Sequence, residues 1–278
     1  MKRSLADILG VRPPIDVVDI GANPIDGPPP YEALRASGLA HVVGFEPNPQ
    51  ALAALHSNPA PRETYLPYAI ADGRAHRVHF CEAPGMTSLL EPNHELLAFF
   101  HGFPEWGRVV RVEPIETRRL DDVAEIGAMD YLKIDVQGAE LMVLEGAVER
   151  LRQCLVVHTE VEFLPMYKGQ PLFAEIEQFL RRQGFVPHKL APTSRTIAPL
   201  IAGNDIGANV GQIFWADVTF IRDFTKLPLL TVEQLLKLAI MLHDVYNSVD
   251  MTLRLLTEAD ARSSGGYAAR FAEAYRAR

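Results

Sequence analysis

The chain has 278 residues, of which 48% are hydrophobic, and it carries a formal net charge of -8. This length and apolar content suit one large domain, or one domain with an extension, and the acidic balance without a long Lys/Arg run argues against a nucleic-acid partner. Two isolated cysteines argue against a disulfide scaffold, and no run approaches the roughly 20 apolar residues of a membrane span, so we expect a cytoplasmic protein.

The first part of the chain alternates short apolar runs with helical patterns. The runs at Ile15–Ile20, His41–Glu46 and Thr64–Asp72 are typical of buried strands, and helices are expected at Pro30–Gly38 and Pro49–Asn58. This β-α-β-α-β order predicts a parallel sheet with helices on both faces.

The middle of the chain is less regular. His76–Glu82 and Arg108–Glu116 are predicted to be added strands. The segment between them, residues 85–107, is rich in Gly, Pro and aromatic residues, which is typical of a lid or a substrate loop.

The alternation then resumes. Further strands are predicted at Met129–Asp135, Cys154–Phe163, Val186–Leu190 and Ile213–Ile221, and helices at Leu141–Leu151 and Gln170–Phe185. After Pro228, the capping box Thr231–Gln234 opens a helical run to about Leu256, and Tyr267–Arg278 is a last helix. We therefore expect a main domain of residues 1–227 and a C-terminal helical extension of residues 228–278.

The sequence DIGAN occurs twice, at residues 19–23 and 205–209. The first copy follows a predicted strand and precedes a helix, and Glu46 ends the next strand. In this arrangement a glycine turn lets backbone N–H groups approach a ligand while the acid accepts hydrogen bonds from ribose hydroxyls. The second copy leads directly into a strand, so it is interpreted as a polar loop, and the first copy is the predicted site.

The kind of cofactor follows from what surrounds the first copy. The turn lacks G-x-G-x-x-G spacing, and three prolines at residues 28–30 leave no free N–H groups for a diphosphate. A ligand without phosphate fits better, and S-adenosylmethionine (SAM) is such a ligand. Asp19 would help to hold the ammonium of its amino-acid tail, directly or through water, and Glu46 would bind its ribose.

Several longer segments resemble one family, the FkbM-type SAM-dependent methyltransferases. They are VVDIGAN, VVGFEPNPQAL, AIADG, TRRLDD, DYLKIDVQGAELMVLEGA, HTEVEFLPMYKGQPLF and FWADVTFIRD, in the family's order over residues 17–223. One departure is Ile25, since the family usually has a glycine two residues after the Asn. The run from Leu230 onward lies outside the resemblance.

The resemblance implies the class I (Rossmann-like) methyltransferase fold, an α/β fold with a mostly parallel sheet of seven strands, the last one antiparallel. It also implies cofactor contacts from the first turn, from the FEPN segment and from the ADG segment. The implied cofactor-binding residues are Asp19, Gly21, Ala22, Asn23, Glu46, Pro47, Asn48, Ala71 and Asp72. Asp135, at the end of the fourth strand, would meet both SAM and the methyl acceptor.

Three ionisable residues, His158, Glu160 and Glu162, alternate along one predicted strand and therefore share a face. Burying three such groups is costly, so they are expected to line a polar cleft; the alternative is a set of internal ion pairs with Arg118, Arg119 or Lys168. His158 or Glu160 would accept the proton of an acceptor hydroxyl, and Asp135 would orient that hydroxyl. Alternatively, Asp135, His158 and Glu160 would hold a divalent cation; no spacing in the sequence selects a metal.

The sequence thus predicts an O-methyltransferase. By resemblance, its acceptor is a hydroxyl of a sugar, a glycolipid or a polyketide-like metabolite. The alternatives are a nicotinamide-dependent sugar oxidoreductase, against which stand the missing G-x-G-x-x-G and Tyr-x-x-x-Lys patterns, and a SAM-binding module without catalysis. Leucine-rich helices outside a core are often interfaces, so a homodimer through the C-terminal helices is expected.

Overall fold

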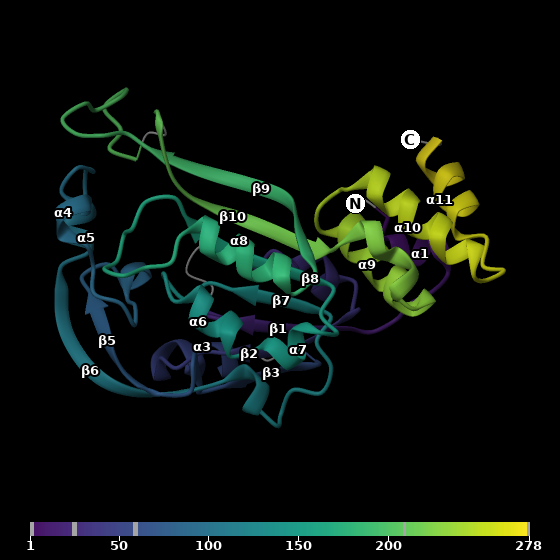
Figure 1. The fold of residues 1–278 in the computed structure, drawn as a ribbon, viewed down its shortest axis with the longest axis horizontal. Helices are drawn as coiled ribbons and strands as arrows, with labels where there is room; N and C mark the ends of the chain where they lie inside the picture. Colours follow the sequence, from purple (N-terminus) through teal and green to yellow (C-terminus); the bar gives the residue numbers. More distant parts are fainter. Residues whose placement is uncertain (1–2, 24–26, 58–60, 208–209, 277–278) are drawn as a thin grey trace.

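The computed structural model describes residues 3–23, 27–57, 61–207 and 210–276 (Figure 1). Its elements run in this order: α1 Leu5–Leu9, β1 Ile15–Ile20, α2 Glu32–Ala36, β2 Ala40–Phe45, α3 Pro49–Ser57, β3 Glu63–Leu66, β4 Ala69–Ile70, β5 Ala75–Cys81, η1 Pro84–Met86, α4 His94–Leu97, α5 Phe103–Trp106, β6 Val109–Arg118, η2 Leu120–Asp122, β7 Tyr131–Ile134, α6 Glu140–Glu145, α7 Val148–Leu151, β8 Val156–Glu162, α8 Phe173–Arg182, β9 Phe185–Arg195, β10 Gln212–Arg222, η3 Phe224–Leu229, α9 Val232–Asp244, α10 Val249–Ala261 and α11 Tyr267–Arg276.

Among the described residues, seven strands form the main sheet in the order β3-β2-β1-β7-β8-β10-β9. Neighbouring strands from β3 to β8 are parallel, and β10, the last strand in the chain, is antiparallel to β8 and β9. Period-two alternation sends Val17 to one face and Val18 to the other, and each face has its own apolar cluster. The predicted mostly parallel sheet with helices on both faces is confirmed.

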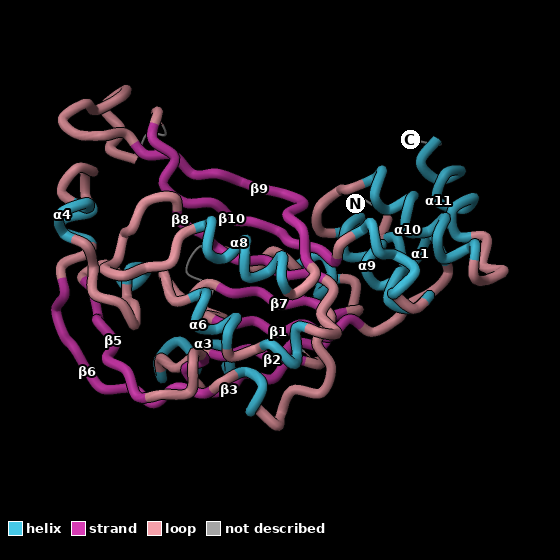
Figure 2. The backbone as a smooth tube through the Cα atoms, in the orientation of Figure 1, coloured by secondary structure: helices cyan, strands magenta, loops and turns pink. Residues whose placement is uncertain are grey.

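The two faces are covered differently. On one face, α6, α7 and α8 bury Val143, Leu144 and Ile176 against apolar strand residues along the whole sheet. On the other face, α1 and the C-terminal helices α9 and α10 pack only against the amino-terminal half of the parallel strands. Figure 2 shows these helices gathered at one end of the sheet, while β5 and β6 stand beyond its opposite end. The carboxyl-terminal half of the second face is thus left for the site.

Three predicted elements are divided in the structure. The prediction of one strand over Thr64–Asp72 is wrong, because this segment forms two strands, β3 and β4. Pro67 between them has no N–H to donate to a neighbouring strand. The chain leaves the main sheet there, and Ala69 pairs with Thr117 of β6 in a second sheet, β4-β6-β5. The helix expected over Leu141–Leu151 breaks at Gly146, where a side chain would lie 2.5 Å from the Ala71 carbonyl oxygen.

The helical run expected from Thr231 to Leu256 also breaks, because Asn247 adopts a left-handed conformation with φ 52° between α9 and α10. Its start is as predicted: Gln234 N–H donates to the Thr231 hydroxyl at 3.1 Å, and Thr231 N–H donates to the Gln234 side chain at 2.9 Å.

The C-terminal helices share their apolar cluster with the sheet. Leu235 and Leu238 of α9 lie in the same cluster as Val17 and Tyr131, and Lys237 donates to the buried carboxylate of Asp130 at 2.8 Å. The division at residues 227 and 228 stays a prediction.

Within the described part of the chain, we find no helix with the length and apolar character that crossing a membrane requires.

Candidate cofactor and acceptor site

The turn after β1 is held between the ends of its two neighbouring strands. Gly21 has φ 78°, and a Cβ at this position would lie 2.0 Å from the carbonyl oxygen of Asp135. The N–H groups of Gly21 and Ala22 both donate to the Phe45 carbonyl at 3.1 Å. Only glycine combines this conformation with so close a contact, so the first DIGAN turn is fixed at the carboxyl edge of the sheet.

Asp19 lies beneath this turn and is 3% exposed. Its carboxylate accepts a 2.6 Å hydrogen bond from Tyr31, and Lys133 Nζ lies 3.3 Å away while donating to the Gly21 carbonyl at 2.7 Å. Burial raises the pKa of Asp19, although Lys133 and Tyr31 oppose this. Burial works to lower the pKa of Lys133, but the charges of Asp19 and Asp135 outweigh it and raise it.

Glu46 follows β2 at the same edge and is 6% exposed. Its Oε1 accepts the Asn48 N–H at 2.7 Å, and the Asn23 backbone N–H also bonds its carboxylate. Burial raises the pKa of Glu46 against these hydrogen bonds. Pro47 and Asn48 are exposed beside it. The structure therefore brings Asn23 and the FEPN segment together, as the sequence predicted.

Ala71 and Asp72 lie between β4 and β5. Ala71 is fully buried and donates its N–H to the Arg118 carbonyl at 3.0 Å. The Asp72 carboxylate bonds His76 at 2.7 Å and the Arg74 N–H at 3.0 Å, so it also stabilises its own turn. Burial favours a higher pKa for Asp72, but the hydrogen bonds from His76 and Arg74 outweigh it and lower the pKa.

Asp135 directly follows β7, Glu160 lies near the end of the neighbouring β8, and Gln137 joins them. Gln137 Nε2 donates to Asp135 at 2.8 Å and lies 3.4 Å from Glu160, while its backbone holds a left-handed φ of 57°. Such a conformation in a non-glycine residue is uncommon and often occurs at functional sites. Burial first, and then the charge of Asp135, raises the pKa of Glu160 well above its usual value.

Glu162 and Glu140 are buried behind this pair. Both oxygens of Glu162 lack a hydrogen-bond partner among the described residues, and burial raises its pKa well above the usual value. Burial also raises the pKa of Glu140 to about 7, although its Oε1 accepts the N–H groups of Val136 and Gly138. The structure therefore supports a shared acidic face and places Glu162 at its buried end.

His158 lies further from the edge than Glu160. Its Nδ1 is 3.1 Å from the Tyr246 hydroxyl and its Nε2 is 3.8 Å from Asp217. Among the described residues, the expected cations do not pair with this strand: Arg118 lies over the Tyr68 ring, Arg119 faces Asp121, and Lys168 bonds Glu91.

Four site residues escaped the sequence analysis because their roles depend on distant partners. Tyr31 and Tyr246 come from segments predicted only as helical. Gln137 and Tyr167, whose hydroxyl donates to Gln137 Oε1 at 3.4 Å, follow strands within motifs. The conspicuous polar residues of DVQGAE were the one signal that could have indicated Gln137, since a polar side chain directly after a buried parallel strand projects at the ligand edge.

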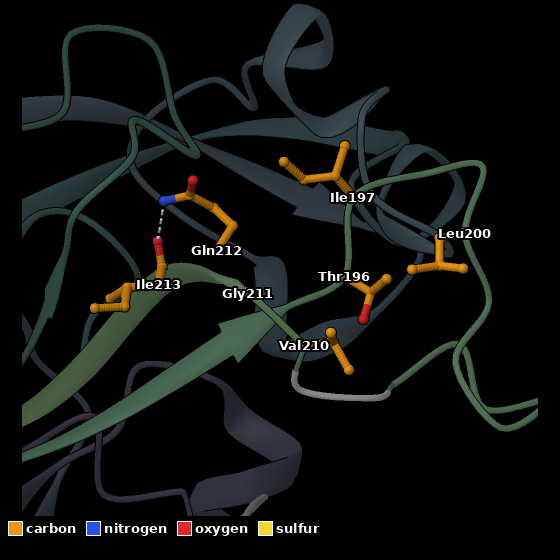
Figure 3. Close-up of a pocket in the computed structure, with 7 residues that line it drawn as sticks. All are labelled: Thr196, Ile197, Leu200, Val210, Gly211, Gln212 and Ile213. Carbon is orange, nitrogen blue, oxygen red and sulfur yellow. Dashed lines mark hydrogen bonds between the residues drawn. The ribbon is translucent and has the colours of Figure 1, made fainter.

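A separate pocket of about 470 Å³ lies at the far end of the β9–β10 hairpin, not at the turn after β1. Figure 3 shows Ile197, Leu200, Val210 and Ile213 along its wall, with the Gln212 amide donating to the Ile213 carbonyl at 2.8 Å. The second DIGAN contributes only Asp205, Ile206 and Gly207 to the described residues, and these form a turn. Ile25, which departs from the family, also lies outside the described ranges.

The residues at this edge of the sheet distinguish between the predicted cofactors. In the part of the chain that the structure describes, no group of three or more His, Cys, Asp or Glu side chains is arranged to hold a metal ion. Pro28, Pro29 and Pro30 stand before the short helix α2 and offer no N–H to a diphosphate. A buried carboxylate at the end of β2 beside a glycine turn instead fits the ribose hydroxyl pair of a ligand without phosphate, which agrees with SAM.

The strand order and this edge define a class I SAM-dependent methyltransferase fold. The methyltransferase FkbM domain model matches residues 19–187. The chain belongs to the FkbM methyltransferase family, and its cofactor is SAM.

The chain is also similar to two other methyltransferases. The 2-O-methyltransferase NoeI of Sinorhizobium fredii is 31% identical over 190 residues, which cover 63% of this chain and 74% of that protein. Magnesium protoporphyrin IX methyltransferase (ChlM) from Synechocystis PCC 6803 with bound SAM is 12% identical, with a TM-score of 0.40 over 78% of this chain and 76% of that one. The same enzyme with bound SAH gives 11% identity, a TM-score of 0.39 and coverages of 78% and 81%.

Replacement of Gly21 by alanine should weaken SAM binding, because the new methyl group would clash with the Asp135 carbonyl and displace the turn. We expect calorimetry to show a loss of at least about tenfold in affinity, which corresponds to about 1.4 kcal/mol. Gly10→Ala is the matched control: φ is 69°, no heavy atom lies within 4 Å, and it should leave SAM affinity unchanged. Equal affinities in the two variants would contradict this role of the turn.

Proposed function

We propose that the chain transfers the methyl group of SAM to a hydroxyl oxygen of a sugar, a glycolipid or a polyketide-like metabolite. The observation that carries this proposal is the Asp135–Gln137–Glu160 arrangement beside the Gly21 turn. It provides carboxylates that can receive a hydroxyl proton next to the place where the cofactor turn ends. The name of the S. fredii relative, a 2-O-methyltransferase, supports an oxygen acceptor.

The proposed cofactor contacts come from three turns. Asp19, Gly21, Ala22 and Asn23 would hold the methionine part, with Asp19 acting from beneath the turn through Lys133 and the backbone. Glu46, Pro47 and Asn48 would bind the ribose and one face of the adenine. Ala71 and Asp72 would face the adenine amino group.

SAM, when bound, supplies a methyl group on a positively charged sulfur. Asp135, whose side chain is 34% exposed, would orient the acceptor hydroxyl, and Glu160 would take its proton as the oxygen–carbon bond forms and the carbon–sulfur bond breaks. Burial and the charge of Asp135 raise the pKa of Glu160, and a carboxylate with a raised pKa is a stronger base toward a hydroxyl proton. The half-buried Gln137 amide would keep the two carboxylates at a fixed separation.

Glu160→Gln should lower kcat by about 100- to 10,000-fold, the usual contribution of a general base. The wild-type rate should fall on the acid side at a pH above the ordinary glutamate value of 4.5, because the raised pKa leaves Glu160 protonated there. Transfer of labelled methyl groups from SAM over a pH series measures both effects. Glu233→Gln, at an exposed residue of α9, is the control and should keep the wild-type rate. An equally unchanged rate in Glu160→Gln would show that another group accepts the hydroxyl proton.

The pocket of the β9–β10 hairpin favours an elongated acceptor with an apolar part. Ile213 stands four residues before Asp217 on β10, about 13 Å away at the usual strand rise. The wall of the pocket is mostly apolar, and its residues Ile197 and Leu200 are 46% and 58% exposed. A sugar that presents its hydroxyl to Glu160 would then place an attached apolar chain in the pocket, which supports a glycolipid or a polyketide-like acceptor over a free sugar.

Leu200→Asp should therefore raise the KM for octyl glycosides by about tenfold, because it places a charge where the chain would lie. The KM for the corresponding free sugars and the affinity for SAM should not change. Leu229→Asp, on a residue that is 79% exposed in η3, is the control. Equal effects on octyl glycosides and free sugars would exclude the pocket from acceptor binding.

We also propose a cytoplasmic homodimer that associates through the C-terminal helices. Leu253 of α10 and Tyr275 of α11 are 40% and 50% exposed, which supports an apolar contact there. Light scattering of the full chain should give twice the chain mass of 30.9 kDa, and Leu253→Asp should lower it. A mass of one chain for the wild type would contradict the dimer.

A further inference from the structure

Tyr246 belongs to the helical part of the chain beyond the family match, yet its side chain reaches the acidic face. It follows α9, and its hydroxyl lies 3.1 Å from Nδ1 of His158 and 2.5 Å from the hydroxyl of Tyr131. The Tyr246 and His158 rings are stacked, with centroids 6.0 Å apart and planes at 23°. The match to the methyltransferase domain ends at residue 187, so the domain model does not include this contact.

The hydrogen bonds around Tyr246 have a direction. Tyr131 is fully buried, and Tyr246 is the one hydrogen-bond partner of its hydroxyl among the described residues, so the Tyr131 hydrogen is satisfied only when it is donated to Tyr246. Burial raises the pKa of Tyr246, which therefore has one hydrogen of its own. With Tyr131 donating to its oxygen, Tyr246 directs that hydrogen to His158 Nδ1. The Thr219 hydroxyl lies 3.3 Å from the same nitrogen and is a second hydrogen-bond partner of the His158 ring.

A nitrogen that accepts hydrogen bonds carries no proton, and a neutral imidazole then has its hydrogen on Nε2. Nε2 of His158 lies 3.8 Å from Asp217 Oδ1, too far for a direct hydrogen bond. Both atoms are within reach of a single hydroxyl placed between them, which would accept from Nε2–H and donate to Asp217. The Asp217 side chain is 58% exposed, so this position is open to an acceptor.

We propose that Tyr246 is a positioning residue that fixes His158 in its Nε2–H form, so that His158 and Asp217 bind a non-reacting hydroxyl of the acceptor. In this form His158 is a donor, and the proton of the reacting hydroxyl goes to Glu160. The part of this inference that concerns an acceptor with several hydroxyls rests on the proposed function. The form of the His158 ring is a property of the protein alone.

Nitrogen NMR of the full chain with ¹⁵N-labelled histidine tests this directly, with His158→Gln used for assignment. We expect the wild-type His158 to show an unprotonated Nδ1 and a protonated Nε2. In Tyr246→Phe, and more strongly in Tyr246→Phe combined with Thr219→Val, the two resonances should move toward each other as both forms become populated. Tyr275→Phe, a half-exposed tyrosine of α11, should leave them unchanged.

A protonated Nδ1 in the wild type, or an unchanged spectrum in the double variant, would overturn the proposal. Calorimetry with SAM shows whether each variant is folded, because the cofactor turn does not include these residues. The NMR measurement requires neither SAM nor an acceptor. A protein with the expected ring form that methylates no hydroxyl would thus refute the proposed function and leave the positioning role of Tyr246 intact.

Discussion

The contact between Gly21 and the carbonyl oxygen of Asp135 is the constraint on which the rest of the site depends. Because no side chain fits between them, the turn after β1 and the end of β7 meet at backbone distance. Lys133, two residues before Asp135, then reaches the Gly21 carbonyl and the Asp19 carboxylate. The proposed cofactor turn and the proposed acceptor residues are therefore parts of one rigid edge, which favours the alignment that a direct displacement requires.

The same sheet face changes character along its strands. Near their amino ends, Val17, Tyr131 and Val156 are buried beneath the C-terminal helices. Toward the carboxyl ends, the same strands carry Asp19, Lys133, Glu160 and Glu162. The C-terminal helices cover the apolar half and do not extend over the ionisable half, and His158 and Tyr246 lie at the boundary. A parallel sheet is normally apolar on both faces, so this polar half is the strongest structural sign of function.

Sequence patterns predicted most of this arrangement because their causes are local. Period-two alternation placed His158, Glu160 and Glu162 on one face, and glycine with a following acid identified the turn and Glu46. The patterns could not show that Pro67 sends the chain into a second sheet, because that depends on pairing with Thr117. Nor could they show that Gln137 joins two carboxylates, or that Tyr246 contacts a histidine 88 residues away.

Contacts between the two ends of the chain affect the order of folding. The Ser4 hydroxyl and the Leu5 N–H donate to Asp244 at 2.6 and 2.9 Å, across 240 and 239 residues. Such long-range contacts cannot form until the intervening chain is present, and they slow folding. During synthesis, the apolar half of the sheet face stays uncovered until α9 and α10, which follow every strand of the sheet, have been made. A nascent or truncated chain would expose this surface, so the helices beyond the family domain protect the protein from aggregation once they have been made and have packed on the sheet.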